Sequence, residues 1–232
     1  MQPQPILILG AGGNSLAIAD AIIAINAASP AQPRYELVGF LDDLPENQAQ
    51  RVLGYPVVGN IEDAHRWPQC QLINGIASVE SFRKIPAVIA RAGAQRERFA
   101  TIVHPRAVIA RDSHIGAGCS IMANSVICSG AHVHDHVIML QNSSINHHSR
   151  LGKFVTVSAG VTVLGCVEAG ENAFLSGGSS VAPYVKIGAG ALVGLGSVVI
   201  RDVAPGTVVA GSPARELTNS RYALKPSRES AA

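Results

Sequence analysis

Residues 121–139, IMANSVICSGAHVHDHVIM, carry an apolar residue at every sixth position, beginning with Ile121, Ile127 and Val133. The same spacing runs without insertion from Val103 to Val199, and nearly all of these residues are Ile, Leu or Val. Four residues after each of them stands only Ala, Ser, Cys or Val. A period of six fits neither an α-helix nor a simple amphipathic strand, and it is typical of a solenoid.

Each hexapeptide is expected to form one short strand and one turn. Its aliphatic side chain points to the inside, and its small residue fits a crowded inner corner. Three hexapeptides make one triangular coil, and successive coils pair in parallel at about 4.8 Å, so that no coil buries its own face alone. The repeats predict a little over five coils.

Composition excludes several classes of protein. The length of 232 residues allows one large or two small domains. Charged residues make up 15%, well below the usual quarter, which suggests that some faces are buried in an oligomer. A net charge of +2 without a basic run or an aromatic patch gives no support for nucleic-acid binding.

Cysteines and hydropathy bear on location. The four cysteines show no CxxC or metal-ligand spacing, which favours free thiols in a reducing compartment. No basic leader precedes the apolar start and no apolar run approaches the length of a membrane span. We therefore expect a cytoplasmic protein without a membrane span.

The first hundred residues follow a different pattern. An apolar strand at residues 5–9 leads into a glycine turn and a helix at about 16–27, and a second strand at 36–41 leads into two acids. A strand at 71–76, a helix at 79–92 and a strand at 99–103 would complete a small α/β unit. The candidate ligand-binding residues are Gly10, Gly12, Gly13, Asn14, Asp42 and Asp43.

Two interpretations of this turn remain open. Amides at a helix N-terminus favour a nucleotide phosphate, and acids at the end of a strand can accept hydrogen bonds from a ribose or base. The full G-x-G-x-x-G pattern is absent, because Ser15 stands where the third glycine would be. The alternative is a tight turn without a ligand, followed by solvated acids.

Taken together, these segments resemble a known family. The G-A-x-G turn at residue 10, the F-L-D-D segment ending at Asp43, His104-Pro105 before the hexapeptides and the VAGSPAR segment at 209–215 are similar to bacterial sugar acetyltransferases. That group contains sialic-acid O-acetyltransferases and nucleotide-aminosugar N-acetyltransferases of the bacillosamine and perosamine type.

The resemblance implies an architecture. Residues 1–102 would form a Rossmann-like domain that binds a nucleotide sugar, and residues 103–217 a left-handed parallel β-helix, followed by a tail at 218–232. The molecule would be a homotrimer that binds acetyl-CoA between neighbouring β-helices. The usual preference for right-handed crossovers would predict the opposite hand.

The resemblance also implies catalytic residues. His147 corresponds to the family's general base, and His148 stands where the family shows an acid. Either His148 itself or a carboxylate from elsewhere in the protein would then orient His147. The backbone amide of Gly165 would meet the acetyl carbonyl, which becomes an oxyanion during direct transfer without an acyl-enzyme. The alternative is a pair of surface or interface histidines that only form hydrogen bonds.

Contacts to acetyl-CoA are expected in the later coils. The candidates are Thr156, Gly165, Gly194, Gly196, Gly211 and Pro213. At Thr156 several family members carry a second histidine, and at Asn14 they often carry a histidine as well. Glycines in the turns of a β-helix also serve geometry alone.

The sequence hypothesis is an N-acetyltransferase that uses acetyl-CoA to modify the amino group of a nucleotide-linked amino sugar. Its nearest alternative is O-acetylation of a sugar such as sialic acid, followed by a metal hydratase or a silent scaffold. His114 and His132 should stack in adjacent coils, but no two histidines are five residues apart as in γ-type carbonic anhydrases. We therefore expect no metal cofactor.

Overall fold

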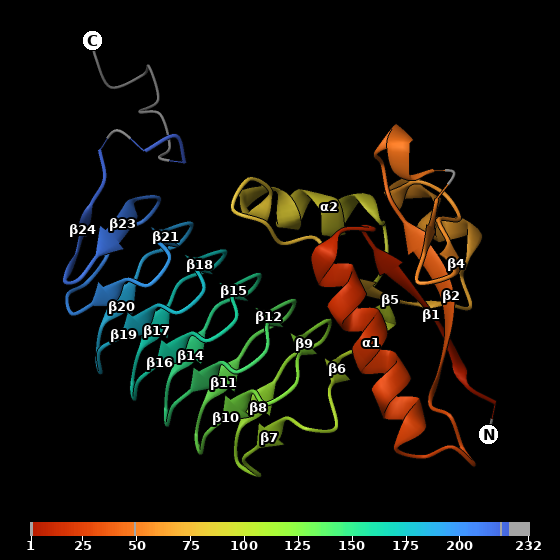
Figure 1. Ribbon diagram of the computed structural model, residues 1–232, viewed down its shortest axis with the longest axis horizontal. Helices are drawn as coiled ribbons and strands as arrows, with labels where there is room; N and C mark the ends of the chain where they lie inside the picture. The colour runs from red at the N-terminus through yellow and green to blue at the C-terminus, as the bar shows by residue number, and fades with distance from the viewer. Residues whose placement is uncertain (1, 49, 219, 223–232) are drawn as a thin grey trace.

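The computed structural model describes residues 2–48, 50–218 and 220–222. An α/β unit lies beside a three-sided parallel β-helix (Figure 1). No helix in these described residues has the length and apolarity needed to cross a membrane.

The α/β unit is built on a three-stranded parallel sheet with the order β2-β1-β5. Its strands are β1 (Gln4–Leu9), β2 (Tyr35–Leu41) and β5 (Gln71–Asn74), with a small hairpin of β3 (Arg51–Val52) and β4 (Tyr55–Pro56). Its helices are α1 (Gly13–Ala27) and α2 (Ile85–Arg91), with 3₁₀ turns at Pro45–Asn47, Ile61–Arg66, Phe82–Lys84 and Arg96–Arg98. The four apolar residues at the end of β1 are buried, because both faces of the sheet are covered.

The β-helix confirms the hexapeptide prediction. Its two-residue strands pair in register with strands eighteen residues away, for example Ile127 with Ile145 and Ile145 with Val163. The inward residues and the small residues four positions later form one buried core that runs along the coils. The hexapeptide repeat therefore determines the fold, because each coil buries its apolar side chains against those of the next coil.

Three sheets form the sides of this β-helix. The first contains β7 (Val108–Ile109), β10 (Val126–Ile127), β13 (Ser144–Ile145), β16 (Thr162–Val163), β19 (Ser180–Val181) and β22 (Val198–Val199). The second contains β8 (His114–Ile115), β11 (His132–Val133), β14 (Arg150–Leu151), β17 (Glu168–Ala169) and β20 (Lys186–Ile187).

The third sheet begins with β6 (Ile102–Val103), β9 (Ser120–Ile121), β12 (Ile138–Met139) and β15 (Thr156–Val157). It continues with β18 (Phe174–Leu175), β21 (Leu192–Val193), β23 (Val208–Gly211) and the antiparallel β24 (Ala214–Glu216).

The outward side chains distinguish the three sides. On the first sheet they are Val, Ser or Thr, and we call this side the uncharged face. On the second they are His114, His132, Arg150, Glu168 and Lys186, the charged face. On the third every first residue from β6 to β23 is buried, and we call this side the covered face.

The α/β unit docks on the covered face. Phe82 and Ile85 pack against Phe174 and Leu192 of the β-helix, with the rings of Phe82 and Phe174 5.2 Å apart. The guanidinium of Arg83 donates hydrogen bonds to the backbone oxygen of Gly190 at 3.0 Å and to that of Tyr222 at 2.7 Å. An apolar contact and a directed polar contact together fix the two parts in one arrangement.

Some local expectations were wrong. The second helix spans only Ile85–Arg91 after a 3₁₀ turn, because Pro86 sets its first turn. The first helix begins at Gly13, three residues earlier than expected. Of the tail expected at 218–232, the structure describes residues 218 and 220–222, which are not helical. All four cysteines are free thiols, as expected.

Candidate active site

The two adjacent histidines lie at the corner that follows β13, at the edge of the uncharged face. Both side chains are exposed, and their Nδ1 atoms are 3.2 Å apart, within hydrogen-bond distance. His148 adopts a left-handed backbone with φ of 58°, so the two neighbouring rings leave the turn in different directions, 77° between their planes. One ring nitrogen of each histidine is therefore engaged by the other.

The glycine eighteen residues further on lies directly against the expected base. A Cβ atom at Gly165 would lie 2.4 Å from Cε1 and 2.5 Å from Nε2 of His147, closer than real side chains come. The carbonyl of Gly165 accepts a hydrogen bond from Tyr184, while its N–H has no acceptor among the described residues. The structure thus brings Nε2 of His147 and a free backbone donor to the same corner.

A carboxylate lies further down the same corner. Asp112, Gly130 and His148 occupy equivalent positions in three successive coils. The hydroxyl of Ser129 donates to Oδ2 of Asp112 at 2.5 Å. This bond lowers the pKa of the Asp112 carboxyl, and the electrostatic effect of His148 lowers it further. Sequence reasoning missed Asp112, because only the eighteen-residue register reveals its position.

Cys166 completes a cluster with the two histidines. The ligating atoms of His147, His148 and Cys166 all lie within 4.8 Å of one another. Two imidazoles and one thiol are ligands that Zn²⁺ accepts, although structural zinc sites use four protein ligands. His114 and His132 are paired in adjacent coils on the charged face, as expected, with ring centroids 6.0 Å apart and ring planes tilted by 34°.

The expected acetyl-CoA contacts are spread over the later coils. Gly194 and Gly196 lie at the corner that precedes β22, on the opposite edge of the uncharged face from Gly165. Gly211 donates its N–H to Ser197 at 3.2 Å and precedes a cis bond between Ser212 and Pro213.

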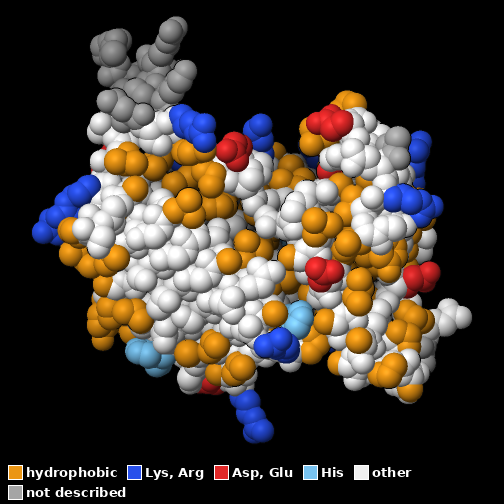
Figure 2. All heavy atoms as spheres, in the orientation of Figure 1, with side chains coloured by type: hydrophobic (Ala, Val, Ile, Leu, Met, Phe, Trp, Pro, Cys, Tyr) orange, Lys and Arg blue, Asp and Glu red, His pale blue; other side chains and the backbone are white. Residues whose placement is uncertain are grey.

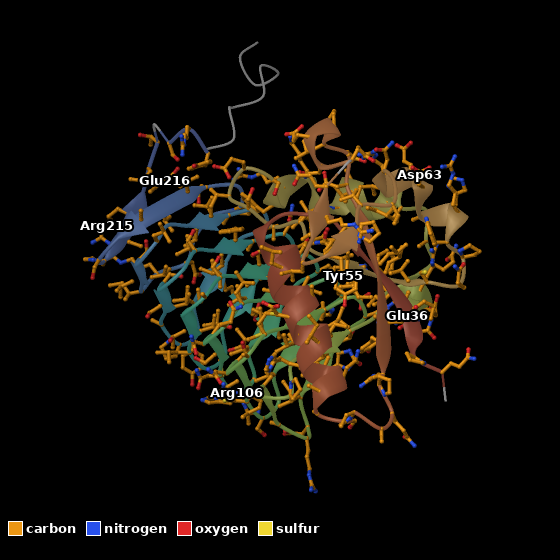
Figure 3. The ribbon with its side chains drawn as sticks, turned by 45° about the vertical axis from the view of Figure 1, so that its right-hand side comes forward. Glu36, Tyr55, Asp63, Arg106, Arg215 and Glu216 are labelled. Atoms are coloured by element: carbon orange, nitrogen blue, oxygen red, sulfur yellow. The ribbon has the colours of Figure 1, made fainter. Side chains whose placement is uncertain are left out.

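Thr156 lies elsewhere. It is buried on the covered face, with no hydrogen-bond partner for its hydroxyl, and is not gathered with His147 within this chain. Arg215, beyond β23, is exposed near the C-terminal end of the β-helix, far from Tyr55 and Asp63 of the α/β unit (Figure 3). Within one chain, Gly165 therefore lies beside His147, whereas Thr156, Gly194 and Gly196 lie elsewhere on the β-helix.

The candidate ligand-binding residues of the α/β unit meet in one pocket of about 510 Å³. Gly10, Gly12, Gly13, Asn14, Asp42 and Asp43 all line it, together with residues of the segments before and within α2. The pocket opens at the N-terminus of α1, whose first turn carries no acidic residue. Such a helix end favours an anionic ligand group.

The two acids of this pocket stabilise its walls. Asp42 accepts the N–H of Ala11 at 2.7 Å and that of Leu44 at 2.8 Å. Asp43 accepts the N–H of Ile61 and pairs with Arg91 at 2.8 Å. Each of the four carboxylate oxygens thus already has a protein partner, so any ligand hydrogen bond would share an occupied acceptor.

The missing third glycine is compensated across the pocket. Ser15 is buried, and its hydroxyl donates to the carbonyl of Gly10 at 2.8 Å. A Cβ at Gly75 would lie 2.1 Å from this hydroxyl oxygen. The glycine that permits close packing is therefore Gly75, which directly follows β5, rather than residue 15.

Lys84 is a pocket residue that sequence reasoning missed. It lines the pocket and forms no ion pair with any described residue, whereas Arg91 is held by Asp43 and Glu62. Nothing in the sequence around Lys84 forms a motif, and only the docking of the Phe82–Lys84 turn brings it to the pocket.

Known proteins share the sequence pattern and the fold of this chain. A family model described as the PglD N-terminal domain matches residues 5–81. The acetyltransferase domain of PglB from Neisseria gonorrhoeae superposes with a TM-score of 0.80 at 26% identity, over 92% of this chain and 100% of that one. These similarities support the resemblance of the chain to the hexapeptide-repeat sugar acetyltransferases.

A second structure of the family carries ligands. PerB from Caulobacter crescentus, in complex with CoA and GDP-perosamine, matches with a TM-score of 0.78 and 26% identity, over 92% of this chain and 97% of that one. Curated relatives match a shorter region: an acyl-[acyl-carrier-protein]–UDP-N-acetylglucosamine O-acyltransferase from Burkholderia thailandensis is 37% identical over 30% of the chain. The chain spans about a quarter of the length of these curated relatives.

Proposed function

We propose that this protein transfers an acetyl group from acetyl-CoA to the amino group of a nucleotide-linked amino sugar. The observation that carries the proposal is the corner where Nε2 of His147 lies against Gly165. The pocket at the start of α1, in a unit similar to the PglD N-terminal domain, supports a nucleotide-linked acceptor. Solved relatives that hold acetyl coenzyme A or CoA support the donor.

The chemistry follows from the two groups at the corner. Nε2 of His147 accepts a proton from the acceptor amine while the amine nitrogen attacks the thioester carbon. The developing oxyanion is stabilised by the N–H of Gly165, which has no acceptor among the described residues. The tetrahedral intermediate then collapses, and CoA leaves as a thiol after receiving that proton back from His147. No covalent acyl-enzyme is needed, and Cys166 has no part in these steps.

In the pocket of the α/β unit, we propose that the diphosphate lies at the N-terminus of α1, beside Lys84. The ammonium of Lys84 has no ion-pair partner among the described residues, so it is available to a phosphate. Asp42 and Asp43 hold the pocket walls and present their remaining lone pairs to the nucleoside.

We propose further that the site is completed in a homotrimer through the uncharged face. Large apolar side chains are exposed on and beside this face, and Tyr184 and Leu195 are 75% and 80% exposed. Charged side chains are sparse over the β-helix in the view of Figure 2. A neighbouring copy on this face would bring its own residues to the edge where His147 lies.

The decisive experiment is thiol release from acetyl-CoA with UDP-, dTDP- and GDP-linked amino sugars, alongside free sialic acid. We expect rapid release with one nucleotide amino sugar and a loss of about 10² to 10⁴ in kcat for His147→Ala, as for removal of a general base. Lys84→Ala should raise KM for the acceptor with little change in kcat. Activity on sialic acid alone would overturn the proposal in favour of O-acetylation, and full activity of His147→Ala would exclude this base.

A further inference from the structure

The family's acid beside the base is replaced here by His148, and the geometry of the corner shows what takes its place. Because the two Nδ1 atoms face each other at 3.2 Å, one of them must carry the proton and the other must accept it. A base that uses Nε2 needs its lone pair there, so the proton of neutral His147 must lie on Nδ1. Nδ1 of His148 is then the acceptor, and the proton of His148 must lie on Nε2.

The Nε2 edge of His148 is turned toward the coil below. Gly130 lies beneath this ring, and a Cβ there would be 2.9 Å from Cδ2 and 3.1 Å from Nε2. The absence of a side chain at Gly130 therefore leaves the space in which the imidazole edge of His148 lies. Gly130 has φ of +67°, a backbone conformation that glycine adopts easily and side-chain-bearing residues seldom do.

Asp112 approaches the same place from the other side. It lies one coil below Gly130 in the same ladder, and the hydroxyl of Ser129 draws its carboxylate toward that coil. Gly130 thus lies next to both side chains, because His148 packs over it and the carboxylate of Asp112 is held against its coil. The electrostatic effect of His148 also lowers the pKa of Asp112, which agrees with the two side chains lying near each other.

We propose that His148 and Asp112 are positioning residues that replace the missing acid: Asp112 holds His148 as the Nε2–H tautomer, and His148 holds His147 as the Nδ1–H tautomer. This inference rests on the proposed function, because it concerns the lone pair of the proposed base. Asp112 exerts its effect through the charge that it presents to His148, and neither residue touches the acceptor.

The same three side chains also suggest a metal site, since Cys166 lies within 4.8 Å of both imidazoles. A zinc ion would occupy the lone pairs that the hydrogen bond uses. The hydrogen-bonded pair accounts for the short distance between the nitrogens with only two residues, whereas a zinc ion would need all three side chains and a fourth ligand such as a water. The two interpretations differ in tautomer and in response to a chelator.

The first test needs no activity. Long-range ¹⁵N NMR of the full chain, after treatment with EDTA, should show Nδ1–H for His147 and Nε2–H for His148, assigned through His147→Ala and His148→Gln. Asp112→Asn should convert part of His148 to the other tautomer. The opposite tautomers in the untreated chain, or a spectrum that changes on adding Zn²⁺ at equimolar concentration, would overturn the inference.

The second test is a double-mutant cycle in the transferase assay. Asp112→Asn should lower kcat about 10-fold without changing KM, and His148→Glu, which restores a carboxylate beside His147, should keep most of the activity. In the His148→Glu background Asp112→Asn should have no further effect. An equal loss in both backgrounds would mean that Asp112 acts only through the fold, and loss of activity on chelation with recovery by zinc would favour the metal.

The two tests separate this inference from the proposed function. If the wild-type protein acetylates none of the acceptors, the proposed function fails, but the tautomers are still measured. If it is active and His147 lacks the Nδ1 proton, the positioning inference fails while the transferase function stands.

Discussion

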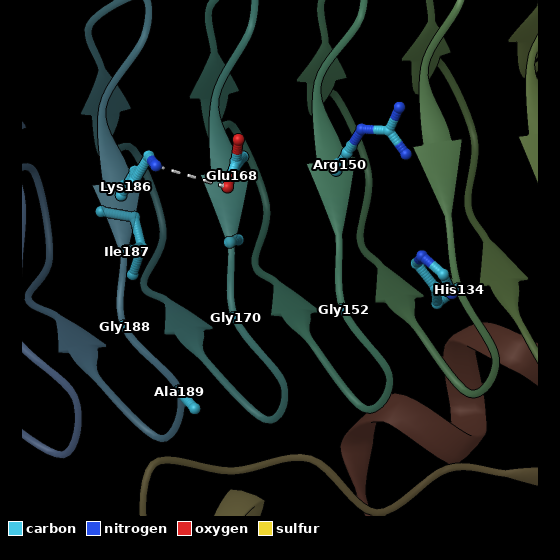
Figure 4. A pocket seen from close by; sticks show the side chains of 10 residues that line it. His134, Arg150, Gly152, Glu168, Gly170, Lys186, Ile187, Gly188 and Ala189 are labelled. Atoms are coloured by element: carbon cyan, nitrogen blue, oxygen red, sulfur yellow. Dashed lines mark ion pairs between the residues drawn. The ribbon is translucent and has the colours of Figure 1, made fainter.

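The uncharged face and the charged face of the β-helix are built from the same repeat, yet they present opposite surfaces. At the centre of the uncharged face, Ser144, Thr162 and Ser180 stack in register. On the charged face, Glu168 and Lys186 are adjacent in the same way, as Figure 4 shows. Because the inner core is equivalent on both sides, the outward residue alone determines whether a side is suited to another protein or to solvent.

The largest effect is expected from a charge placed on the uncharged face. Thr162→Arg would introduce an unpaired charge into the proposed trimer interface, at a cost of about 3 kcal/mol or more. Association should weaken by at least about 100-fold, and activity should fall at low protein concentration. Light scattering after size-exclusion chromatography measures this. A trimer of unchanged stability would show that this face is not the interface.

Within the edge of the same face, Gly165→Ala tests how closely the base is packed. The added Cβ would lie 2.4 Å from Cε1 of His147, so the ring must move. We expect kcat to fall about 100-fold, as when a catalytic group is displaced by about 1 Å. In the His147→Ala background Gly165→Ala should not lower kcat further, and the thermal stability of the Gly165→Ala protein should equal that of the wild type. A further loss there would mean that Gly165 matters for a reason other than the ring.

The corner between the charged and covered faces carries a titratable group that affects stability. His136 is buried between the rings of Phe99 and Phe154, and burial lowers its pKa to about 4. Since the unfolded chain takes up this proton near pH 6.5, stability is fully present above that pH and is lost as pH falls toward 4.

Unfolding by urea at several pH values measures this effect. We expect a loss of about 1 to 3 kcal/mol between pH 6.5 and 4. His136→Leu should make stability nearly constant over that range. The pKa of Asp135 is held at about 2 by the hydrogen bond from Arg96, so its own contribution is lost only at lower pH. A His136→Leu protein with the same pH dependence would contradict the assignment.

The smallest effect is expected on the charged face. Glu168 and Lys186 are 59% and 66% exposed and 4.0 Å apart. Such a pair contributes less than about 0.5 kcal/mol, so Glu168→Gln should leave unfolding, oligomeric state and kcat nearly unchanged. The substitution is the matched control for Thr162→Arg, and a large effect on association would reverse the roles of the two faces.

The sequence predicted the β-helix well because its information is local and repeated. Each inward residue, such as Ile127 or Ile145, meets its own equivalent eighteen positions away, so one repeat length places every strand. The α/β unit was predicted less precisely. Gly75 compensates for Ser15 from a distant strand end, and no spacing rule connects these two positions.

The candidate site shows the same limit. The six residues expected in the pocket do line one cavity, yet the hydrogen bonds of Asp42 and Asp43 to the loop amides could not be read from an acid pair. His147 and Gly165 meet because they are one coil apart, which the repeat predicts. Lys84 and Asp112 carry no motif, and their positions depend on docking and on register.

The contact made by Phe82 and Arg83 has a consequence for exchanging parts between relatives. Phe82 packs on Phe174, and Arg83 donates to two backbone oxygens, those of Gly190 and Tyr222. The pocket of one unit is therefore held at a set distance from the coils of the other. A chimera that imports a new nucleotide pocket should carry residues 82–85 together with the outward residues of β18 and β21, or the grafted pocket will be misaligned.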